Sequence, residues 1–267
     1  MSSHRLRPLL APALLLAAGA CRDAPAPPPP PATPPPAAVA PRPAGPVKWG
    51  EIEGRVLLTG TPPPPPSAPT SATVASVCGD QALDRSLVVG AQGALAYAVV
   101  SLQDGAALPE PETPAPPPVL DQKQCHYEPP ALAAKAGGEL LLRNSDPLVH
   151  NVRAQAGTNR SVFNVAMPLE GMTLRRPLPA EPGTVQVRCD VHPWMHAVVR
   201  TFNHPYFVAT TPDGRFRLRV PEGAHTLTFW HARLPEASRP VTVRAGETVQ
   251  LEQTWDVGAL LQEGSGK

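Results

Sequence analysis

The segment from Val187 to His196 constrains the fold most, because three metal-donor side chains share one short loop between two strand-like runs. Cys189, His192 and Met195 are spaced as Cys-x2-His-x2-Met. Thiolate, imidazole and thioether are the soft and borderline donors that select copper. Such a loop supplies three ligands, so one more imidazole must come from elsewhere in the chain.

His150 is the candidate for that further ligand. It follows Asn144-Ser145-Asp146-Pro147, a run of turn-forming residues that ends a strand-like segment. Two imidazoles and one thiolate with a weak axial methionine describe a blue-copper electron-transfer centre. Four other histidines could also be donors, but each is singly placed and is expected to be a surface or packing residue: His126, His196, His204 and His231.

Alternation along the strand before the loop predicts that the thiol is buried. Val185, Val187 and Cys189 are two residues apart, so their side chains share one face of a strand. A free thiol on an apolar face would be neutral, whereas a bound metal would hold it as the thiolate. Further upstream, Gly137-Gly138 between two apolar runs predicts a hairpin.

These residues resemble the cupredoxin, or blue-copper, family. The His-Asn-Val of 150–152 and the Cys-x2-His-Pro-aromatic-Met of 189–195 carry the resemblance, which covers roughly residues 119–203. Within the family, the short ligand loop is most similar to those of amicyanin and plastocyanin. Single-domain members end soon after this loop, whereas this chain continues for about 65 residues.

The resemblance implies a Greek-key β-sandwich that holds one copper ion. It implies that His150, Cys189 and His192 are the equatorial ligands and Met195 the axial ligand. It also implies that Asn151 joins the His150 loop to the Cys189 loop by hydrogen bonds. Pro193 and Trp194 would lie at the rim, where an exposed apolar surface could dock a redox partner; the alternative is that Trp194 packs inward.

Proline clusters divide the chain and argue against helices. The sequence has 39 prolines among 267 residues, and residues 22–46 are almost entirely Pro and Ala. Such a segment cannot form a core, so we expect a disordered tether of extended polyproline II. Because no later stretch shows capped helical periodicity, the rest is predicted to be all-β.

Residues 204–257 are predicted to form a second, small antiparallel sandwich, followed by a tail at 258–267. Two patterns, Thr211-x-Asp213-Gly214-x-Phe216 and Pro221-x-Gly223-x-His225-x-Leu227, resemble the carboxypeptidase regulatory-like (transthyretin-like) module. This module implies binding or structure and no peptidase activity. Val241 and Val243, turning through residues 245–247 into Val249 and Leu251, predict a further hairpin.

The opening strand of such a module is not directly upstream of Thr211. Residues 47–118 form either a separate N-terminal β segment or the missing part of this sandwich, supplied by the strand-like runs around Gly54-Arg55-Val56 and Ala98-Val99-Val100. In the second case the copper-type domain is inserted into a discontinuous sandwich.

The N-terminus predicts export. Residues 1–21 have arginines, an apolar run too short to span a bilayer, and Ala18-Gly19-Ala20-Cys21, which resembles a lipobox. Cys21 is expected to be the lipidated first residue of the exported protein, which it would anchor to a membrane. The expected location is the periplasm, or the outer membrane or cell surface. The alternative is an ordinary signal peptide cut nearby, which would leave a free thiol.

Two further cysteines remain after the lipid and metal positions are assigned. In an oxidising compartment Cys78 and Cys125 are expected to form a disulfide, stabilising the fold by a few kcal/mol. The alternative is a second metal site at Cys125-His126.

The predicted function is one-electron transfer to an unknown periplasmic redox protein. The alternatives are copper binding and delivery without electron transfer, or a non-redox binding sandwich. We expect no enzyme activity, because four donors fill the coordination sphere and no His-x-His pair, Cys-x3-Cys motif, nucleophile elbow or phosphate loop occurs. The net charge of +1 gives no electrostatic case for nucleic acid.

Overall fold

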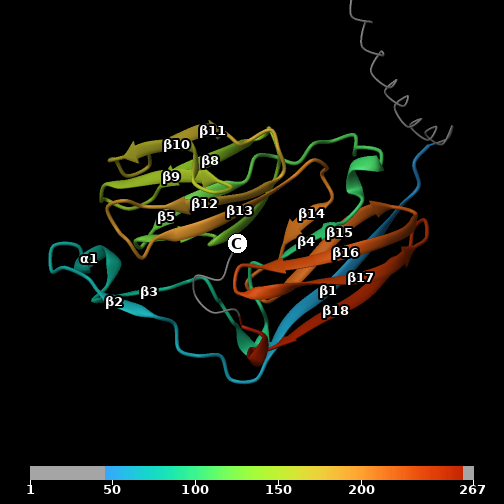
Figure 1. Ribbon diagram of the computed structural model, residues 1–267, viewed down its shortest axis with the longest axis horizontal. Helices are drawn as coiled ribbons and strands as arrows, with labels where there is room; N and C mark the ends of the chain where they lie inside the picture. Colours follow the sequence, from blue (N-terminus) through green and yellow to red (C-terminus); the bar gives the residue numbers. More distant parts are fainter. Residues whose placement is uncertain (1–45, 261–267) are drawn as a thin grey trace, which may run out of the picture. The chain divides into compact units, whose positions relative to one another are not determined.

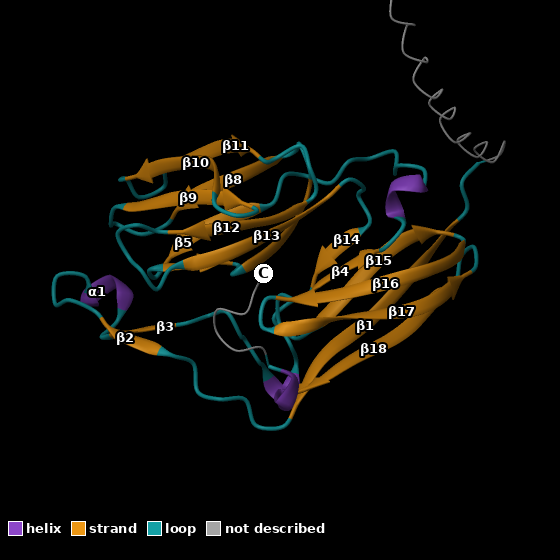
Figure 2. Cartoon of the chain, viewed as in Figure 1, coloured by secondary structure: helices purple, strands orange, loops and turns teal. Residues whose placement is uncertain are grey.

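The computed structural model describes residues 46–260, and nearly all of their regular structure is β-strand (Figures 1 and 2). The all-β prediction is confirmed. The predicted signal peptide with Cys21, all of the linker but its last residue, and residues 261–267 of the tail lie outside the described residues. Within the described part, no helix is long and apolar enough to cross a membrane.

The first sandwich is formed between residues 119 and 202. One sheet has the strand order β10-β9-β12-β13-β7 and the other has the order β11-β8-β5-β6. The strands are β5 (Val119–Lys123), β6 (His126–Glu128), β7 (Ala131–Lys135), β8 (Glu139–Asn144), β9 (His150–Ala156), β10 (Arg160–Met167), β11 (Thr173–Pro177), β12 (Gly183–Arg188) and β13 (His196–Phe202).

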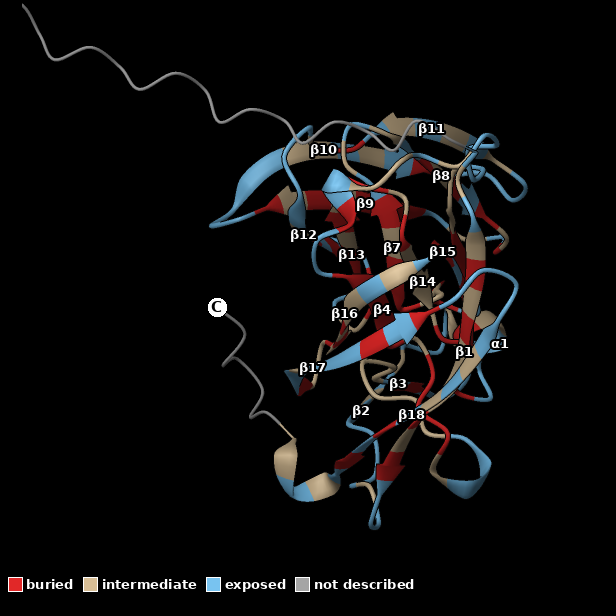
Figure 3. Ribbon diagram, turned by 90° about the vertical axis from the view of Figure 1, so that its right-hand side faces the viewer, coloured by how far each residue is buried: buried red, intermediate tan, exposed pale blue. Residues whose placement is uncertain are grey.

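Alternating apolar residues build the core of this sandwich. Leu140 and Leu142 on β8 are buried, as are Val185 and Val187 on β12, while residues between them are more exposed. Each such side chain contributes about 1.5–3 kcal/mol on burial. In Figure 3 the edge strand β10 is largely exposed, so the core is concentrated on the inner strands.

The second sandwich takes strands from both sides of the first in the sequence. Its sheets have the orders β15-β1-β18 and β14-β4-β16-β17. The strands are β1 (Trp49–Thr59), β4 (Val99–Leu102), β14 (Phe207–Ala209), β15 (Arg215–Pro221), β16 (Gly223–His231), β17 (Leu234–Val243) and β18 (Thr248–Asp256). The first sandwich is therefore inserted between β4 and β14.

Strand β1 holds one sheet of the second sandwich together. It pairs antiparallel with β15 and parallel with β18, so this sandwich is not purely antiparallel. The Asp213-Gly214 turn before β15 lies against β1: Val56 N–H donates to the Gly214 carbonyl at 2.8 Å. A side chain at Gly214 would have a Cβ only 2.7 Å from the Val56 carbonyl oxygen, and its φ of +75° also requires glycine.

A lobe that we define as residues 67–83 departs from the second sandwich. It contains β2 (Ser67–Pro69), α1 (Ala75–Cys78) and β3 (Gln81–Leu83). Val74, Val77 and Cys78 pack on the core of the first sandwich. Elsewhere between residues 46 and 260 there are three short 3-10 helices: η1 (Ala91–Gly93), η2 (Gly105–Ala107) and η3 (Val257–Ala259).

Both predicted hairpins are wrong. The Gly137-Gly138 turn joins β7 to β8, which belong to opposite sheets, and residues 244–247 likewise join β17 to β18 across the second sandwich. Alternation predicts which side chains are buried, and both pairs of strands do bury one face. It does not predict whether a turn returns to the same sheet or crosses to the facing one.

Candidate metal centre

Cys189 lies directly after β12, and its side chain is buried, continuing the inward face of Val185 and Val187. The loop that follows closes on itself. Cys189 N–H donates to the Met195 carbonyl at 3.1 Å, and Met195 N–H donates to the His192 carbonyl at 2.9 Å. These two bonds turn the chain back into β13, so the three donor residues of the loop stay together.

His150 is the first residue of β9 and is fully buried. The loop before it is shaped by the buried side chain of Asn144, which donates to the carbonyls of Leu148 and Met167, both at 2.9 Å. The same side chain accepts from Asp146 N–H at 3.0 Å. These contacts hold the loop that delivers His150 to the core.

Three of the four predicted ligands meet around one point. The His150 and His192 Nδ1 atoms are 2.9 Å apart, and the Cys189 Sγ is 3.8 Å from His192 Nδ1. All three donor atoms lie within 4.8 Å of one another, and all three residues are buried. Bonds of roughly 2.0–2.3 Å to one ion place its donors about 3–4 Å apart, so this set fits a single metal ion.

Met195 is also buried and belongs to the same apolar cluster as Cys189. The resulting cluster of two imidazoles, a thiol and a thioether is consistent with one copper ion. The buried apolar cluster that contains Cys189 and Met195 also contains Val152, Val187 and Ala197, so the sulfur donors lie in a dry part of the core.

Asp146 is a site residue for which the sequence predicted no role. Its carboxylate accepts from His150 Nε2 at 2.9 Å, which leaves Nδ1 free to face the other donors. Backbone N–H groups of Gln124 and Cys125 donate to the same carboxylate at 2.6 and 2.8 Å. The position of Asp146 four residues before His150 was the only hint in the sequence.

Asn151 connects the two ligand loops. Its Oδ1 accepts from Asp190 N–H at 2.5 Å, and its Nδ2 donates to the Asp190 carboxylate at 2.9 Å. The same Nδ2 donates to Asn164 on β10 at 2.8 Å. Asn151, next to His150, therefore ties the His150 loop to Asp190, next to Cys189.

The electrostatics of the site favour a thiolate. Burial alone would raise the pKa of the Cys189 thiol, but hydrogen bonds from His150, His192 and the Asn151 backbone lower that pKa to about 6. Burial likewise opposes the charged form of His150, yet the hydrogen bond to Asp146 and the nearby Cys189 raise its pKa above the ordinary value. A thiol of lowered pKa binds a metal cation with less competition from protons.

The lobe closes one side of the site. Cys78 on α1 and Cys125 before β6 form a disulfide, and both sulfur atoms lie within 4.8 Å of a His192 ring nitrogen. Half-buried Trp194 donates from its indole N–H to the Cys125 carbonyl at 3.1 Å. The alternative metal site at Cys125-His126 is wrong, because Cys125 is in the disulfide and the His126 ring faces the backbone carbonyls of Gln124 and Leu83.

The fold and the site together define a β-sandwich protein with one buried centre of two imidazoles, a thiol and a thioether. The chain is similar to the reduced Cu(I) form of an amicyanin variant: 25% identity, TM-score 0.29, covering 39% of this chain and 98% of that one. It is also similar to amicyanin from Paracoccus versutus (21%, TM-score 0.29, 39% and 97%).

A third similarity is to a Cu-containing nitrite reductase from Thermus scotoductus SA-01. The identity is 17% and the TM-score 0.28, covering 34% of this chain and 23% of that one. No family model matches the sequence, and no curated protein does. Because the TM-scores lie below 0.5, the case for copper rests on the donor geometry.

Proposed function

We propose that this protein is a cupredoxin-type electron carrier that holds one copper ion through His150, Cys189, His192 and Met195. The observation that carries the proposal is the convergence of two Nδ1 atoms and one Sγ, all buried, on a single point. Copper in such a site supplies one-electron chemistry, cycling between Cu(I) and Cu(II).

The protein's own contribution is a rigid, dry donor set. Asp146 and Asn151 fix the His150 loop from two directions, and the Cys189 loop is closed by its own backbone hydrogen bonds. Donors that are held in place need little rearrangement when the charge of the ion changes. Since four donors fill the site, a carrier fits better than an enzyme with an open coordination position.

Exposed apolar side chains around the ligand loops support the proposal that a redox partner binds there. Val149 precedes His150, and Val191 lies between Cys189 and His192; these side chains are 47% and 49% exposed. Leu169, which follows β10, is 67% exposed. Apolar side chains exposed at loops that carry metal ligands suit a transient docking surface, so we propose that the redox partner binds here.

We further propose that the protein is exported and lipid-anchored through Cys21, which the N-terminal sequence pattern supports. A disulfide between Cys78 and Cys125 is in keeping with an oxidising compartment.

The second sandwich is proposed to be a binding module of the carboxypeptidase regulatory-like type, supported by the Asp213-Gly214 turn and the strands that flank it.

The deciding experiment is metal analysis with a visible spectrum of the copper-loaded protein and of Cys189→Ser. We expect one copper per chain, an intense thiolate-to-copper band that bleaches reversibly on reduction, and loss of that band in Cys189→Ser. His196→Asn is the matched control, since His196 lies next to the loop and pairs instead with Asp84 at 3.3 Å.

Two outcomes would redirect the proposal. Tight Cu(I) binding without reversible cycling would favour copper storage or delivery. Absence of copper uptake by the wild-type protein would leave only a binding sandwich.

A further inference from the structure

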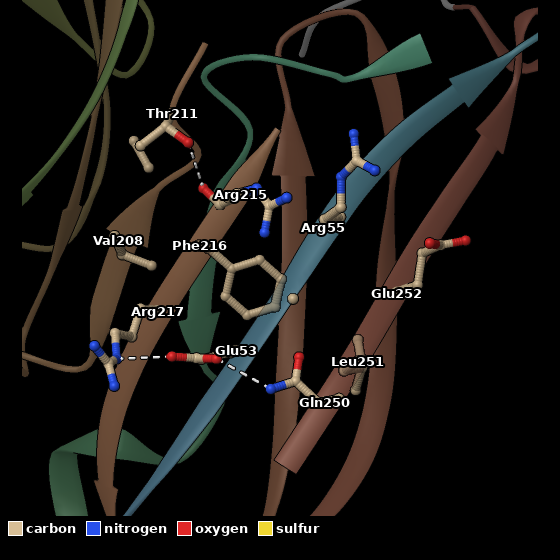
Figure 4. Close-up of a pocket in the computed structure, with 12 residues that line it drawn as sticks. Glu53, Arg55, Val208, Thr211, Arg215, Phe216, Arg217, Gln250, Leu251 and Glu252 are labelled. Carbon is tan, nitrogen blue, oxygen red and sulfur yellow. Dashed lines mark hydrogen bonds and ion pairs between the residues drawn. The ribbon is translucent and has the colours of Figure 1, made fainter. Parts of the chain in front are cut away.

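On the outer face of the sheet β15-β1-β18, charged side chains of β1 lie opposite charged side chains of β15 (Figure 4). Two of these cross-strand pairs have opposite charges, and the third has like charges. Cross-strand register on β1 and β15 gives two complementary rows, Glu51–Arg219 and Glu53–Arg217. The next row in the same register places Arg55 opposite Arg215. Like charges directly opposite on neighbouring strands destabilise a sheet.

The Glu53 row is internally satisfied. Arg217 forms ion pairs with Glu51 and with Glu53, the latter at 3.0 Å. Gln250 on β18 donates to the other oxygen of the Glu53 carboxylate at 3.0 Å. This row therefore has no need of a ligand.

The Arg55 row is not satisfied. Within the described part of the chain Arg215 has one ion pair, with Asp213 at 3.0 Å; both side chains are mostly exposed, so this pair neutralises little of the charge. Arg55 forms no side-chain hydrogen bond or ion pair with any residue between 46 and 260, although Glu252 is its register neighbour on β18. Its Nε is buried without an acceptor, and a buried donor left unpaired destabilises the fold.

The two arginines lie at the edge of a cavity of about 670 Å³. This volume is within the range of small-molecule sites, roughly 300–1,000 Å³. Figure 4 shows the guanidinium groups of Arg55 and Arg215 on neighbouring strands at the same end of the pocket. Val208 and Leu251 also line the pocket, and both pack against the core of the second sandwich. Guanidinium groups match the oxygens of carboxylates and phosphates.

We propose that this pocket binds a small oxyanion, a carboxylate or phosphate group on a partly apolar molecule, between Arg55 and Arg215. The anion separates the two like charges and supplies the acceptor that Arg55 Nε lacks. The proposal concerns the second sandwich alone and does not depend on copper.

The test is isothermal titration and thermal unfolding of the full chain with inorganic phosphate and with hexanoate, at ionic strength matched with chloride. We expect saturable binding and a raised Tm with at least one of the two probes. Arg55→Gln should bind that probe at least tenfold more weakly, and Arg215→Gln should weaken it in the same direction. Arg244→Gln, an equal change of charge on the exposed turn before β18, should bind as the wild type does.

Sedimentation with phosphatidylglycerol vesicles identifies the source of the anion. Arg55-dependent binding to vesicles, with weak binding of free phosphate, assigns a lipid headgroup and supports the proposal. Two results overturn it: no binding of phosphate, hexanoate or vesicles by the wild type, or equal binding by wild type and Arg55→Gln.

Discussion

At the residue scale, the candidate centre depends on the side chains that orient the ligands as much as on the ligands. Sequence spacing identified Cys189, His192 and Met195, because they lie within seven consecutive residues. It could not identify the role of Asp146, which accepts backbone N–H groups from residues more than twenty positions earlier. That contact exists only after the sheets have assembled.

Asp146→Asn should weaken copper binding about 10–100-fold, as expected for loss of a group that orients a ligating histidine. Removing the carboxylate lowers the basicity of His150, which favours Cu(I) over Cu(II), so the reduction potential should rise. Competition titrations and voltammetry measure the two effects. Glu112→Gln, an exposed acid on the loop before β5, is the control. An unchanged potential in Asp146→Asn would mean that Asp146 only shapes the loop.

His231 should make the copper-free protein less stable in mild acid. Burial, with a smaller effect of nearby Arg233, lowers the pKa of His231 from 6.5 to about 4. Between these values the unfolded chain binds more protons than the folded chain, so stability falls as the pH drops from 6.5 to 4. The lowering of the pKa from 6.5 to about 4 corresponds to a loss of about 3 kcal/mol in the free energy of unfolding.

Urea unfolding at pH 7 and pH 4.5 measures this loss. His231→Asn should reduce the difference between the two pH values, since asparagine can accept from Arg233 N–H, as His231 Nδ1 does at 3.2 Å, without becoming charged. His225→Asn, on the same strand β16, should keep the wild-type difference. Equal pH dependence in His231→Asn and the wild type would exclude His231 as the cause.

At the element scale, the sequence predicts which face of a strand is buried better than it predicts which strand pairs with which. Alternation before the ligand loop placed Cys189 on the buried face that continues from β12, and buried residues alternate along β8 and β15 as well. The pairing of β7, β8, β17 and β18 was not found, because it depends on where the facing sheet lies. The lobe at 67–83 was missed as well, since its short elements have no periodicity and pack on a distant core.

The disulfide should stabilise the fold mainly by holding this lobe. It closes a loop with a sequence separation of 47 residues, so replacing Cys78 and Cys125 with serine should lower the free energy of unfolding by about 2–4 kcal/mol. Urea unfolding measures the loss. Hydrogen exchange should show faster exchange at 74–78 than in β12. A reductant should destabilise the wild type but not the double variant; the same loss in both would point to another thiol.

At the scale of the whole molecule, the second sandwich is completed by strands that precede the first. β1 lies between β15 and β18, and β4 lies between β14 and β16. Residues 204–267 alone therefore lack an inner strand of each sheet. They should show no cooperative unfolding transition, because β15 and β18 have no partner in their own sheet.

Excising the inserted sandwich should restore folding. Leu102 N–H donates to the Tyr206 carbonyl at 3.0 Å, and β4 and β14 are antiparallel, so the chain ends left by removing 104–204 are adjacent. We expect a chain that joins Gln103 to Pro205 through Asn-Gly, with Cys78→Ser, to unfold cooperatively in urea and to give a β-type circular dichroism spectrum. If residues 204–267 fold alone, β1 and β4 are not required for the second sandwich. If the excised chain stays unfolded, the discontinuous sandwich does not fold as an independent unit.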